Sequence, residues 1–241
     1  MKKIFLYNRR FYMGAVSAIA GALLIAFYTN PPWRTLALIG ALPALWWLCS
    51  SLLVSYYVYD RSPLYSLRWL DRCLSRSPER WVNIHAGLDE TSERLAALFP
   101  SAEGRILDVY DRREMTEPSI AEARRITPAH LRTTGADWRA LPLADHAVDT
   151  AFLIFAAHEL RHSSARAQLF REVARVLRAG GELVLVEHLR DWPNFLAFGP
   201  GFLHFLPERA WRRAAEAASL RLKLRTSLTP FVHVFVLRHA T

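Results

Sequence analysis

The hydrophobic pattern of the chain changes character near residue 60. Before that point, two runs carry no charged residue: Phe11 to Tyr28, about 18 residues, and Thr35 to Tyr59, about 25 residues. A helix needs roughly 20 apolar residues to cross a bilayer, so each run predicts a membrane-spanning helix. The short polar turn between them holds two prolines, which end the first helix, and a tryptophan, which suits a membrane interface.

Basic residues give the expected orientation of this hairpin. They flank its two outer ends, whereas the connecting turn has only Arg34; the flanking residues are Lys2, Lys3, Arg9, Arg10, Arg61, Arg68, Arg72 and Arg76. Since Lys and Arg stay on the cytoplasmic side, we expect a two-pass protein of the cytoplasmic (inner) membrane with both termini and the globular part in the cytoplasm. A signal peptide is the alternative for the first run, but no small-residue cleavage site follows it.

After residue 80, short apolar runs alternate with helical patterns. The run Ala151 to Ala157 is followed by a stretch in which Leu169, Val173 and Val176 fall on one helical face, and then by the apolar run 182–187. Glycines 180 and 181 are expected to end the helix. A strand–helix–strand unit with continuous apolar strands predicts a parallel sheet covered by helices.

Ligands of such sheets bind beyond the carboxyl ends of the strands. His158 and Glu159 follow the first apolar run, and Glu187 and His188 end the second. These polar residues are therefore candidates for a functional site.

Other segments complete the pattern. The sequence predicts strands at 80–84 and 105–111, a helix at 92–99, a helix at 208–219, and a final hairpin of strands 220–226 and 231–238. The stretch Tyr65 to Leu74 predicts an amphipathic helix, either on anionic lipid or packed on the globular domain.

Two segments carry a family resemblance: "GADWRALPLADHAVDTAFLIFAAHEL" and "FREVARVLRAGGELVLVEH". Their order and spacing resemble the C-terminal half of class I S-adenosylmethionine-dependent methyltransferases, and the resemblance covers roughly residues 80–238. It implies an α/β fold: a Rossmann-like, doubly wound, mostly parallel sheet with a C-terminal antiparallel hairpin. The expected organisation is a transmembrane hairpin at 1–60, a juxtamembrane linker at 61–79 and the methyltransferase-like domain at 80–241.

The resemblance also implies a cofactor, S-adenosylmethionine, and residues that bind it. The turn after the first strand reads "HAGLD", where related methyltransferases have "GAGLD". Gly87 matches the second glycine, but His85 replaces the first and Asn83 replaces the usual acidic residue. This degenerate motif leaves three possibilities open: an altered cofactor contact at His85, a relative that no longer methylates, or a shifted register.

Further cofactor residues follow from the same resemblance. The family has an acidic residue at the end of its second strand that accepts the ribose hydroxyls; Asp111 fits this role, with Asp108 as the alternative. Asp137 corresponds to the carboxylate that accepts from the adenine amino group, and Trp138 beside it is suited to stack on the ring. A turn-capping Asp and a core Trp are the structural alternatives.

At the acceptor end, His158 is a candidate general base because the pKa of histidine lies near neutrality. Glu187 is a second catalytic candidate, although positioning alone can carry methyl transfer. The aromatic stretch Asp191 to Leu206, interrupted by Pro and Gly, predicts a lipophilic pocket, a membrane contact or core filling.

Composition excludes several other classes. The chain has 31 Lys and Arg against 22 Asp and Glu, a formal charge of +9, yet no nucleic-acid-binding module is recognisable. Two cysteines make no disulfide framework, and no Cys and His cluster has zinc-site spacing, so no metal is expected. There is no Gly-Lys-Ser/Thr of a P-loop, and Lys223 lacks the tyrosine four residues earlier that a short-chain reductase needs.

The sequence thus predicts a membrane-anchored methyltransferase that acts on a small lipophilic acceptor such as a quinone, a polyketide or a lipid. The alternative is a non-catalytic membrane-anchored scaffold on a degenerate methyltransferase fold, motivated by His85 and Asn83. Neither the acceptor nor the oligomeric state follows from the sequence.

Overall fold

The computed structural model describes residues 9–127 and 130–239, so that Lys2 and Lys3 lie outside the described residues. The chain forms two compact units. The helical unit comprises residues 1–61 and 191–204, and the sheet unit comprises residues 62–190 and 205–241.

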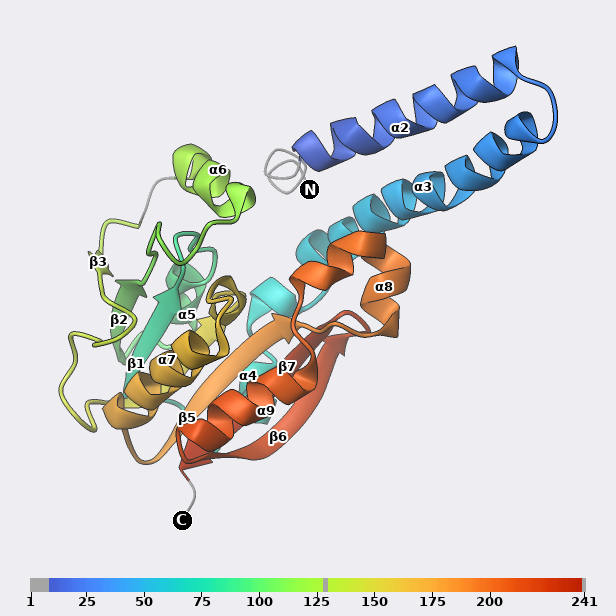
Figure 1. The fold of residues 1–241 in the computed structure, drawn as a ribbon. Helices are drawn as coiled ribbons and strands as arrows, with labels where there is room; N and C mark the ends of the chain where they lie inside the picture. The colour runs from blue at the N-terminus through green and yellow to red at the C-terminus, as the bar shows by residue number, and fades with distance from the viewer. Residues whose placement is uncertain (1–8, 128–129, 240–241) are drawn as a thin grey trace. The chain divides into compact units, whose positions relative to one another are not determined.

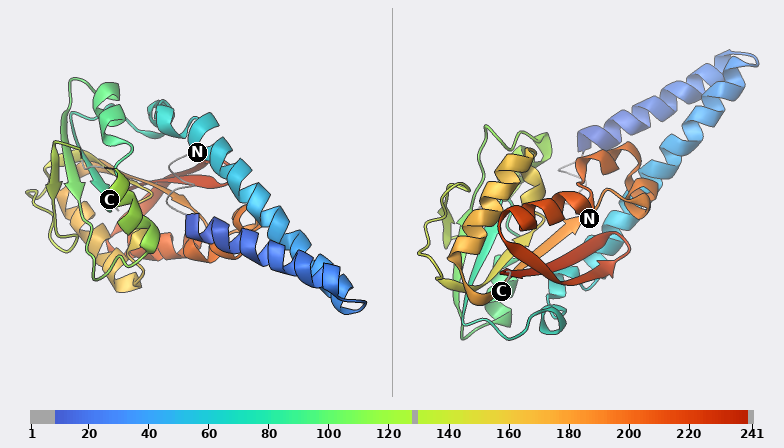
Figure 2. Two further views of the ribbon diagram at one scale, coloured as in Figure 1. Left: turned by 90° about the horizontal axis from the view of Figure 1, so that it is seen from above. Right: turned by 60° about the horizontal axis from the view of Figure 1, so that its bottom comes forward.

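The helical unit is built on two long helices that run antiparallel, α2 (Arg9–Tyr28) and α3 (Trp33–Tyr56), as Figure 2 shows. By length and composition, both are long and apolar enough to cross a membrane. A π-helical turn, η1 (Tyr57–Arg61), extends α3. The remaining part of this unit is α8 (Trp192–Phe198) followed by the 3-10 segment η4 (Gly199–His204).

The sheet unit contains a seven-stranded sheet of order β3-β2-β1-β4-β5-β7-β6 (Figure 1). Its strands are β1 (Arg80–His85), β2 (Glu103–Asp108), β3 (Thr133–Gly135), β4 (Val148–Ile154), β5 (Leu177–His188), β6 (Leu220–Thr229) and β7 (Val232–His239). The first five are parallel, and β7 runs antiparallel to both β5 and β6. The predicted doubly wound sheet with a C-terminal antiparallel hairpin is confirmed.

Helices cover both faces of this sheet. In Figure 1, α7 (Ser163–Val176) and α9 (Glu208–Ala217) lie on one face and α5 (Ser92–Leu98) on the other, while α6 (Pro118–Ile126) follows β2. The α7 stripe predicted from spacing is buried, with Leu169, Val173 and Val176 almost fully covered. Burying such a stripe against apolar strands is what stabilises a helix of this length.

The strands pack closely enough to require glycine at one position in β2. A Cβ atom on Gly104 would lie 2.2 Å from the Trp81 ring, because that indole lies flat over the neighbouring strand. Trp81 is 2% exposed and contacts Phe152 edge to face, with ring centroids 6.4 Å apart.

The predicted amphipathic helix at 65–74 is wrong. The segment forms a 3-10 turn, η2 (Leu64–Ser66), and a single helical turn, α4 (Leu70–Cys73). Leu64, Leu67 and Leu70 are fully buried in the sheet unit, so the segment packs on the globular domain, but as two short turns and not as a helix. Hydrogen bonds also hold the segment on the domain; for example, the Arg94 guanidinium donates to the Tyr65 carbonyl at 2.8 Å.

Two element boundaries also differ from the prediction. The second strand ends at Asp108 and not at residue 111, because its pairing partner β1 ends at His85. The helix before β5 ends at Val176, and glycines 180 and 181 lie inside the strand. The helix ends before the glycines because Leu177 pairs with Val148 of β4. The two glycines lie where the register of this pairing shifts, and Gly180 has φ +72°.

Candidate cofactor and acceptor site

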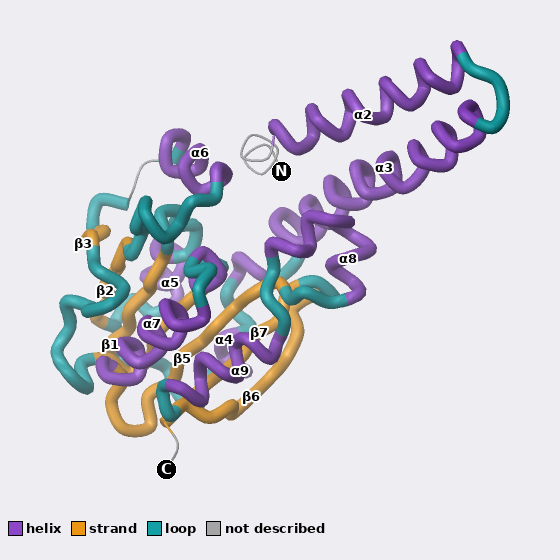
Figure 3. Tube along the Cα trace, viewed as in Figure 1, coloured by secondary structure: helices purple, strands orange, loops and turns teal. Residues whose placement is uncertain are grey.

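The candidate site lies at the carboxyl ends of the parallel strands. Strand order reverses between β1 and β4, since β2 and β3 lie to one side and β5 to the other. A crevice outside the strand ends at such a reversal is the usual ligand site of an open α/β sheet. The chain leaves β1 and β2 at the same edge of the sheet (Figure 3).

Asn83, which replaces the acidic residue of the motif, organises the turn after β1. Its side-chain amide donates to Thr91 Oγ1 at 3.0 Å and to Ser92 Oγ at 2.8 Å. Asp89 accepts from the backbone N–H groups of Thr91 and Ser92, at 3.1 and 3.0 Å. These bonds satisfy donors at the start of α5, so Asn83 and Asp89 hold the turn to the helix.

His85 occupies the position where the resemblance places the first glycine. Its side chain is 4% exposed, and the Gly87 N–H donates to His85 Nδ1 at 3.3 Å. Burial lowers the pKa of His85, although Asp89 and Asp108 oppose this. The imidazole is therefore neutral with its proton on Nε2, and that nitrogen has no hydrogen-bond partner among the described residues.

Gly87 and Asp108 face a side chain that the sequence did not single out, Arg124 of α6. Arg124 Nη1 forms a short ion pair with Asp108 Oδ2 and its guanidinium lies 4.4 Å from the centre of the Tyr110 ring. Gly87 has φ +93°, and a Cβ there would lie 2.8 Å from the Arg124 side chain. The turn favours glycine for its backbone conformation, whereas the flexible, partly exposed Arg124 side chain can move aside.

Asp111, Asp137 and Trp138 are brought together around a second arginine, Arg139. Its Nη1 lies 3.2 Å from Asp111 Oδ2 and 3.3 Å from Asp137 Oδ1, and its Nη2 lies 3.3 Å from Glu114. The guanidinium stacks 3.9 Å from the centre of the Trp138 ring. The hydrogen bond from the Arg113 backbone N–H, together with Arg139, lowers the pKa of Asp111.

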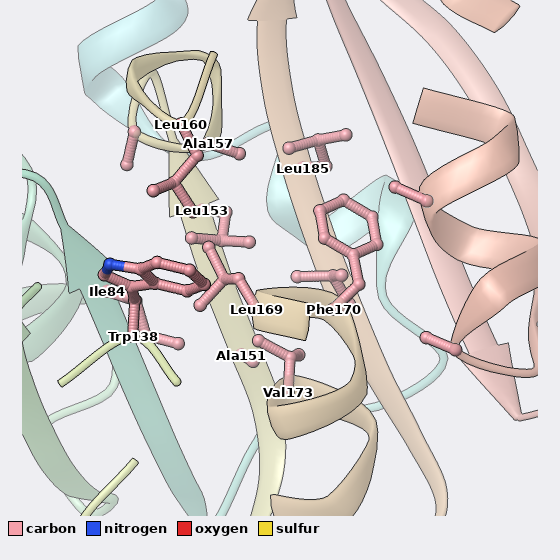
Figure 4. Close-up of a cluster of buried hydrophobic side chains, with 14 of the residues drawn as sticks. Ile84, Trp138, Ala151, Leu153, Ala157, Leu160, Leu169, Phe170, Val173 and Leu185 are labelled. Carbon is pink, nitrogen blue, oxygen red and sulfur yellow. The ribbon is translucent and has the colours of Figure 1, made fainter. Parts of the chain in front are cut away.

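Trp138 itself is a core residue. It is 5% exposed, and Figure 4 shows its indole among Ile84, Leu153 and Leu169. Asp137 takes the turn-capping role, since its carboxylate accepts from the backbone N–H of Arg139 at 2.8 Å. The structure thus shows a turn-capping Asp137 and a buried Trp138, and their contacts to the cofactor stay predictions.

The acidic residue at the end of β2 is Asp108, and Asp111 lies three residues beyond the strand. Asp108 pairs in register with His85, beside the position of the first glycine. The shorter strand therefore puts Asp108, the alternative named from the sequence, at the strand end, where the family has its acidic residue. Which of the two carboxylates accepts from the ribose stays a prediction.

These residues fit S-adenosylmethionine in their chemistry. Asp108 and Asp137 offer carboxylates at the sheet edge, Gly87 has the positive φ of a turn without a side chain, and His85 Nε2 is a donor without a partner among the described residues. Arg124 and Arg139 now pair with these carboxylates and would have to rotate away. When bound, this cofactor supplies an electrophilic methyl group; the chain supplies the acceptors that hold it.

The acceptor candidates form a buried cluster of charge. His158 Nδ1 lies 2.7 Å from Glu187 Oε2, and His158 Nε2 lies 3.3 Å from Glu159 Oε1. The His158 backbone N–H also donates to Glu187 Oε1 at 3.2 Å. Burial by itself lowers the pKa of His158, but the two carboxylates outweigh it and raise the pKa to about 10.

His158 is therefore protonated at neutral pH. A general base must be unprotonated, so this raised pKa argues against the base role expected from the sequence. Neighbouring His188 lies between two aromatic rings, 5.1 Å from Phe155 and 4.7 Å from Phe205, and its Nδ1 contacts the Phe231 carbonyl at 2.8 Å. This stacking assigns His188 a packing role.

One cavity among the described residues is lined by residues other than the candidate site residues. Its volume is ≈ 630 Å³, and Trp81, Phe99 and Gly104 contribute to its lining, whereas none of the predicted site residues does. Because the charged candidate residues gather at the carboxyl ends of the strands, the chemistry is assigned there.

Comparisons with known proteins agree with this reading of the fold. Residues 94–185 match the family model described as a methyltransferase domain. A comparison with curated proteins found no match.

Solved structures show the same fold at low sequence identity. The structure of human N-acetylserotonin methyltransferase in complex with S-adenosylmethionine is 12% identical, with 99% of this chain and 70% of that chain covered and a TM-score of 0.57. A methyltransferase from Aquifex aeolicus is 14% identical over 76% of this chain and 92% of that chain, with a TM-score of 0.53. One from Methanosarcina mazei is 15% identical over 70% and 96%, with a TM-score of 0.51. The methyltransferase fold inferred from the sequence is confirmed, and the methyltransferase-domain match agrees with the expected S-adenosylmethionine cofactor.

Proposed function

We propose that this chain, which carries a class I S-adenosylmethionine-dependent methyltransferase domain, is anchored in the cytoplasmic membrane and methylates a small lipophilic acceptor such as a quinone, a polyketide or a lipid. The observation that carries the proposal is the union in one chain of a methyltransferase domain with two helices long and apolar enough to cross a membrane. An anchored enzyme meets acceptors that are concentrated in the bilayer. Both termini and the domain face the cytoplasm in this proposal, because the basic residues flank the outer ends of the hairpin.

The acceptor end of the site supports a methyl transfer that depends on positioning and not on a general base at His158. His158 is cationic, and its side chain is 14% exposed, beside two carboxylates. Both ring nitrogens of His158 are engaged by carboxylates, Nδ1 by Glu187 and Nε2 by Glu159, so the imidazolium is compensated within the cluster and does not take a proton from the acceptor. Glu187 then acts as the partner that holds the imidazole ring in place, and positioning supplies most of the rate.

A second candidate function has its own support. Arg124 and Arg139 pair with the carboxylates that would hold the cofactor, and His85 fills the place of a glycine. If these contacts persist in solution, the domain is a membrane-anchored scaffold without methyl transfer. Cofactor binding separates the two functions.

The deciding experiment is calorimetric titration of S-adenosylhomocysteine into the detergent-purified full chain. Micromolar binding supports the enzyme, and a folded protein that does not bind at millimolar concentration supports the scaffold. Asp108→Ala and Asp137→Ala should each weaken binding about tenfold or more, because a hydrogen bond to a charged group contributes about 1.5–3 kcal/mol. Asp111→Ala tests whether Asp111, the residue assigned from the sequence, accepts from the ribose. Glu103→Ala is the matched control, because Glu103 lies in an exposed ion pair with Arg105.

The anchor is tested on membranes that contain the full chain. Resistance to extraction with alkaline carbonate is expected of a two-pass protein, and release into the soluble fraction would contradict the anchor. Labelling with a membrane-impermeant thiol reagent tests the orientation: Arg34→Cys should react from the outside and Arg61→Cys only after the membrane is opened. The reverse pattern would overturn the cytoplasmic placement.

A further inference from the structure

We propose that residues 191–204 form a third membrane element, a short helix and 3-10 segment that enters the bilayer from the cytoplasmic side and lies against α3 among the lipid acyl chains. This inference rests on the proposed anchor, because it needs α3 to span the membrane. It adds a surface that the hairpin does not require: a segment from the far end of the sequence that contacts lipid directly.

The segment docks on α3 through its backbone. The indole N–H of Trp46 donates to the Leu196 carbonyl at 3.0 Å, and Ser50 Oγ donates to the Ala197 carbonyl at 2.8 Å. These carbonyls belong to the last turn of α8, where a helix leaves its C=O groups without helical partners. An unsatisfied carbonyl is costly in lipid, so donors from α3 at these two sites are what a membrane-embedded helix end requires.

The contact is close and depends on a glycine. Gly199 ends α8 with φ +54°, and a Cβ there would lie 2.4 Å from the Trp47 ring. The ring of Phe195 packs against Trp47 edge to face, with centroids 5.6 Å apart. Backbone and ring therefore meet directly, as in the small-residue contacts between membrane helices.

The other side of the segment presents apolar side chains outward. Trp192 is 73% exposed and Leu196 is 53% exposed. Residues 192–204 contain no Asp, Glu, Lys or Arg. Asp191, just before the helix, caps it by accepting the Asn194 backbone N–H at 3.0 Å, so its charge stays at the entry end.

The position of the docking site on α3 determines the depth. Trp46 and Ser50 precede the end of α3 at Tyr56 by ten and six residues, which places them about 15 Å and about 9 Å along the helix from that end. A hydrocarbon core is about 30 Å thick, so this contact falls within the cytoplasmic leaflet when Tyr56 lies at the interface. Lipid is therefore the occupant that covers Trp192 and Leu196, because the same α3 surface continues into the proposed span.

The test measures lipid contact at single positions of the full chain. Leu196→Cys, Leu42→Cys and Arg105→Cys are prepared in a background with Cys49→Ser and Cys73→Ala, labelled with a fluorophore, and reconstituted into phosphatidylcholine–phosphatidylglycerol vesicles. Part of the phosphatidylcholine carries bromine on its acyl chains, which quenches fluorophores in contact with lipid. Trp192→Cys is the second position if Leu196→Cys does not fold.

The outcomes separate this proposal from the anchor. Leu42, 66% exposed on α3, should be strongly quenched, and Arg105, on an exposed strand start, should not. The proposal predicts that quenching at residue 196 is at least about half as strong as quenching at residue 42, as expected for interfacial insertion. Quenching at 42 without quenching at 192 or 196 overturns the third element and leaves the anchor standing. No quenching at 42 overturns the anchor, and this inference with it.

Discussion

Substituting Glu187 by Gln should change the pH dependence of stability in a defined window. His158 lies 2.7 Å from Glu187 in a buried site, and its pKa rises from 6.5 to about 10. A group whose pKa is raised on folding stabilises the native state fully below its unfolded pKa, and this stabilisation is lost as the pH rises toward the folded pKa. The native protein should therefore lose stability between pH 6.5 and pH 10.

The size of the effect follows from the pKa. A rise from 6.5 to about 10 corresponds to at most about 5 kcal/mol, since one pH unit is worth about 1.4 kcal/mol. For a domain of this size, 1 kcal/mol moves the melting temperature by roughly 2–4 °C, so the native protein should lose at most roughly 10–20 °C across the window. Glu187→Gln removes the nearer charge while keeping the shape, and burial then brings the pKa of His158 down.

The measurement is thermal unfolding of the detergent-solubilised full chain at pH 6.5, 7.5, 8.5 and 10. The variant should be least stable relative to the native protein at pH 6.5, and the two curves should converge toward pH 10. Glu172→Gln is the control, because hydrogen bonds from Arg175 lower the pKa of Glu172 and its contribution is lost only in acid. A native melting temperature that stays level from pH 6.5 to 10, or parallel curves for the variant, would refute the assigned cluster.

Three further changes test the packing and the site. Gly104→Ala should destabilise the sheet unit by about 1–3 kcal/mol through overpacking against Trp81, seen as a lower melting temperature. Lys223→Met should cost about 3–5 kcal/mol, because it leaves the Glu182 carboxylate buried without the ammonium 2.7 Å away; the double change with Glu182→Gln should recover most of it. Arg139→Gln should tighten S-adenosylhomocysteine binding in calorimetry if this arginine competes with the cofactor, and weaker binding would show that it helps to hold it.

Much of the fold was predictable because the pattern of burial is periodic. Continuous apolar runs such as Ala151 to Ala157 need cover on both faces, and only a parallel sheet between helix layers gives it. The strand boundaries were less predictable: β2 ends at Asp108 because its register follows β1, a relation between segments that no local pattern encodes. The same is true of Leu177, which leaves the helix because a partner strand pairs with it.

The candidate site was predictable in its residue types and not in its pairing. Asp137 and Trp138 were predictable because they match a family motif. Arg139 follows them directly, but its ion pairs were not predictable, because no local sequence pattern specifies the partners of an exposed arginine. Arg124 lies 16 residues from Asp108 along the chain, and their ion pair depends on how α6 returns over the sheet edge. Long flexible side chains find partners that only the folded backbone specifies.

The sequence by itself determined the alternation of strands and helices, the two apolar helices and the chemistry at the strand ends, because hydrophobic period and residue type are local properties. Tertiary structure alone decided the protonation of His158, since Glu187 comes from a strand 29 residues later. It also decided that Trp46 and Leu196, 150 residues apart, share a hydrogen bond. Electrostatic and hydrogen-bond energies depend on distance in space, and distance in space is what folding supplies.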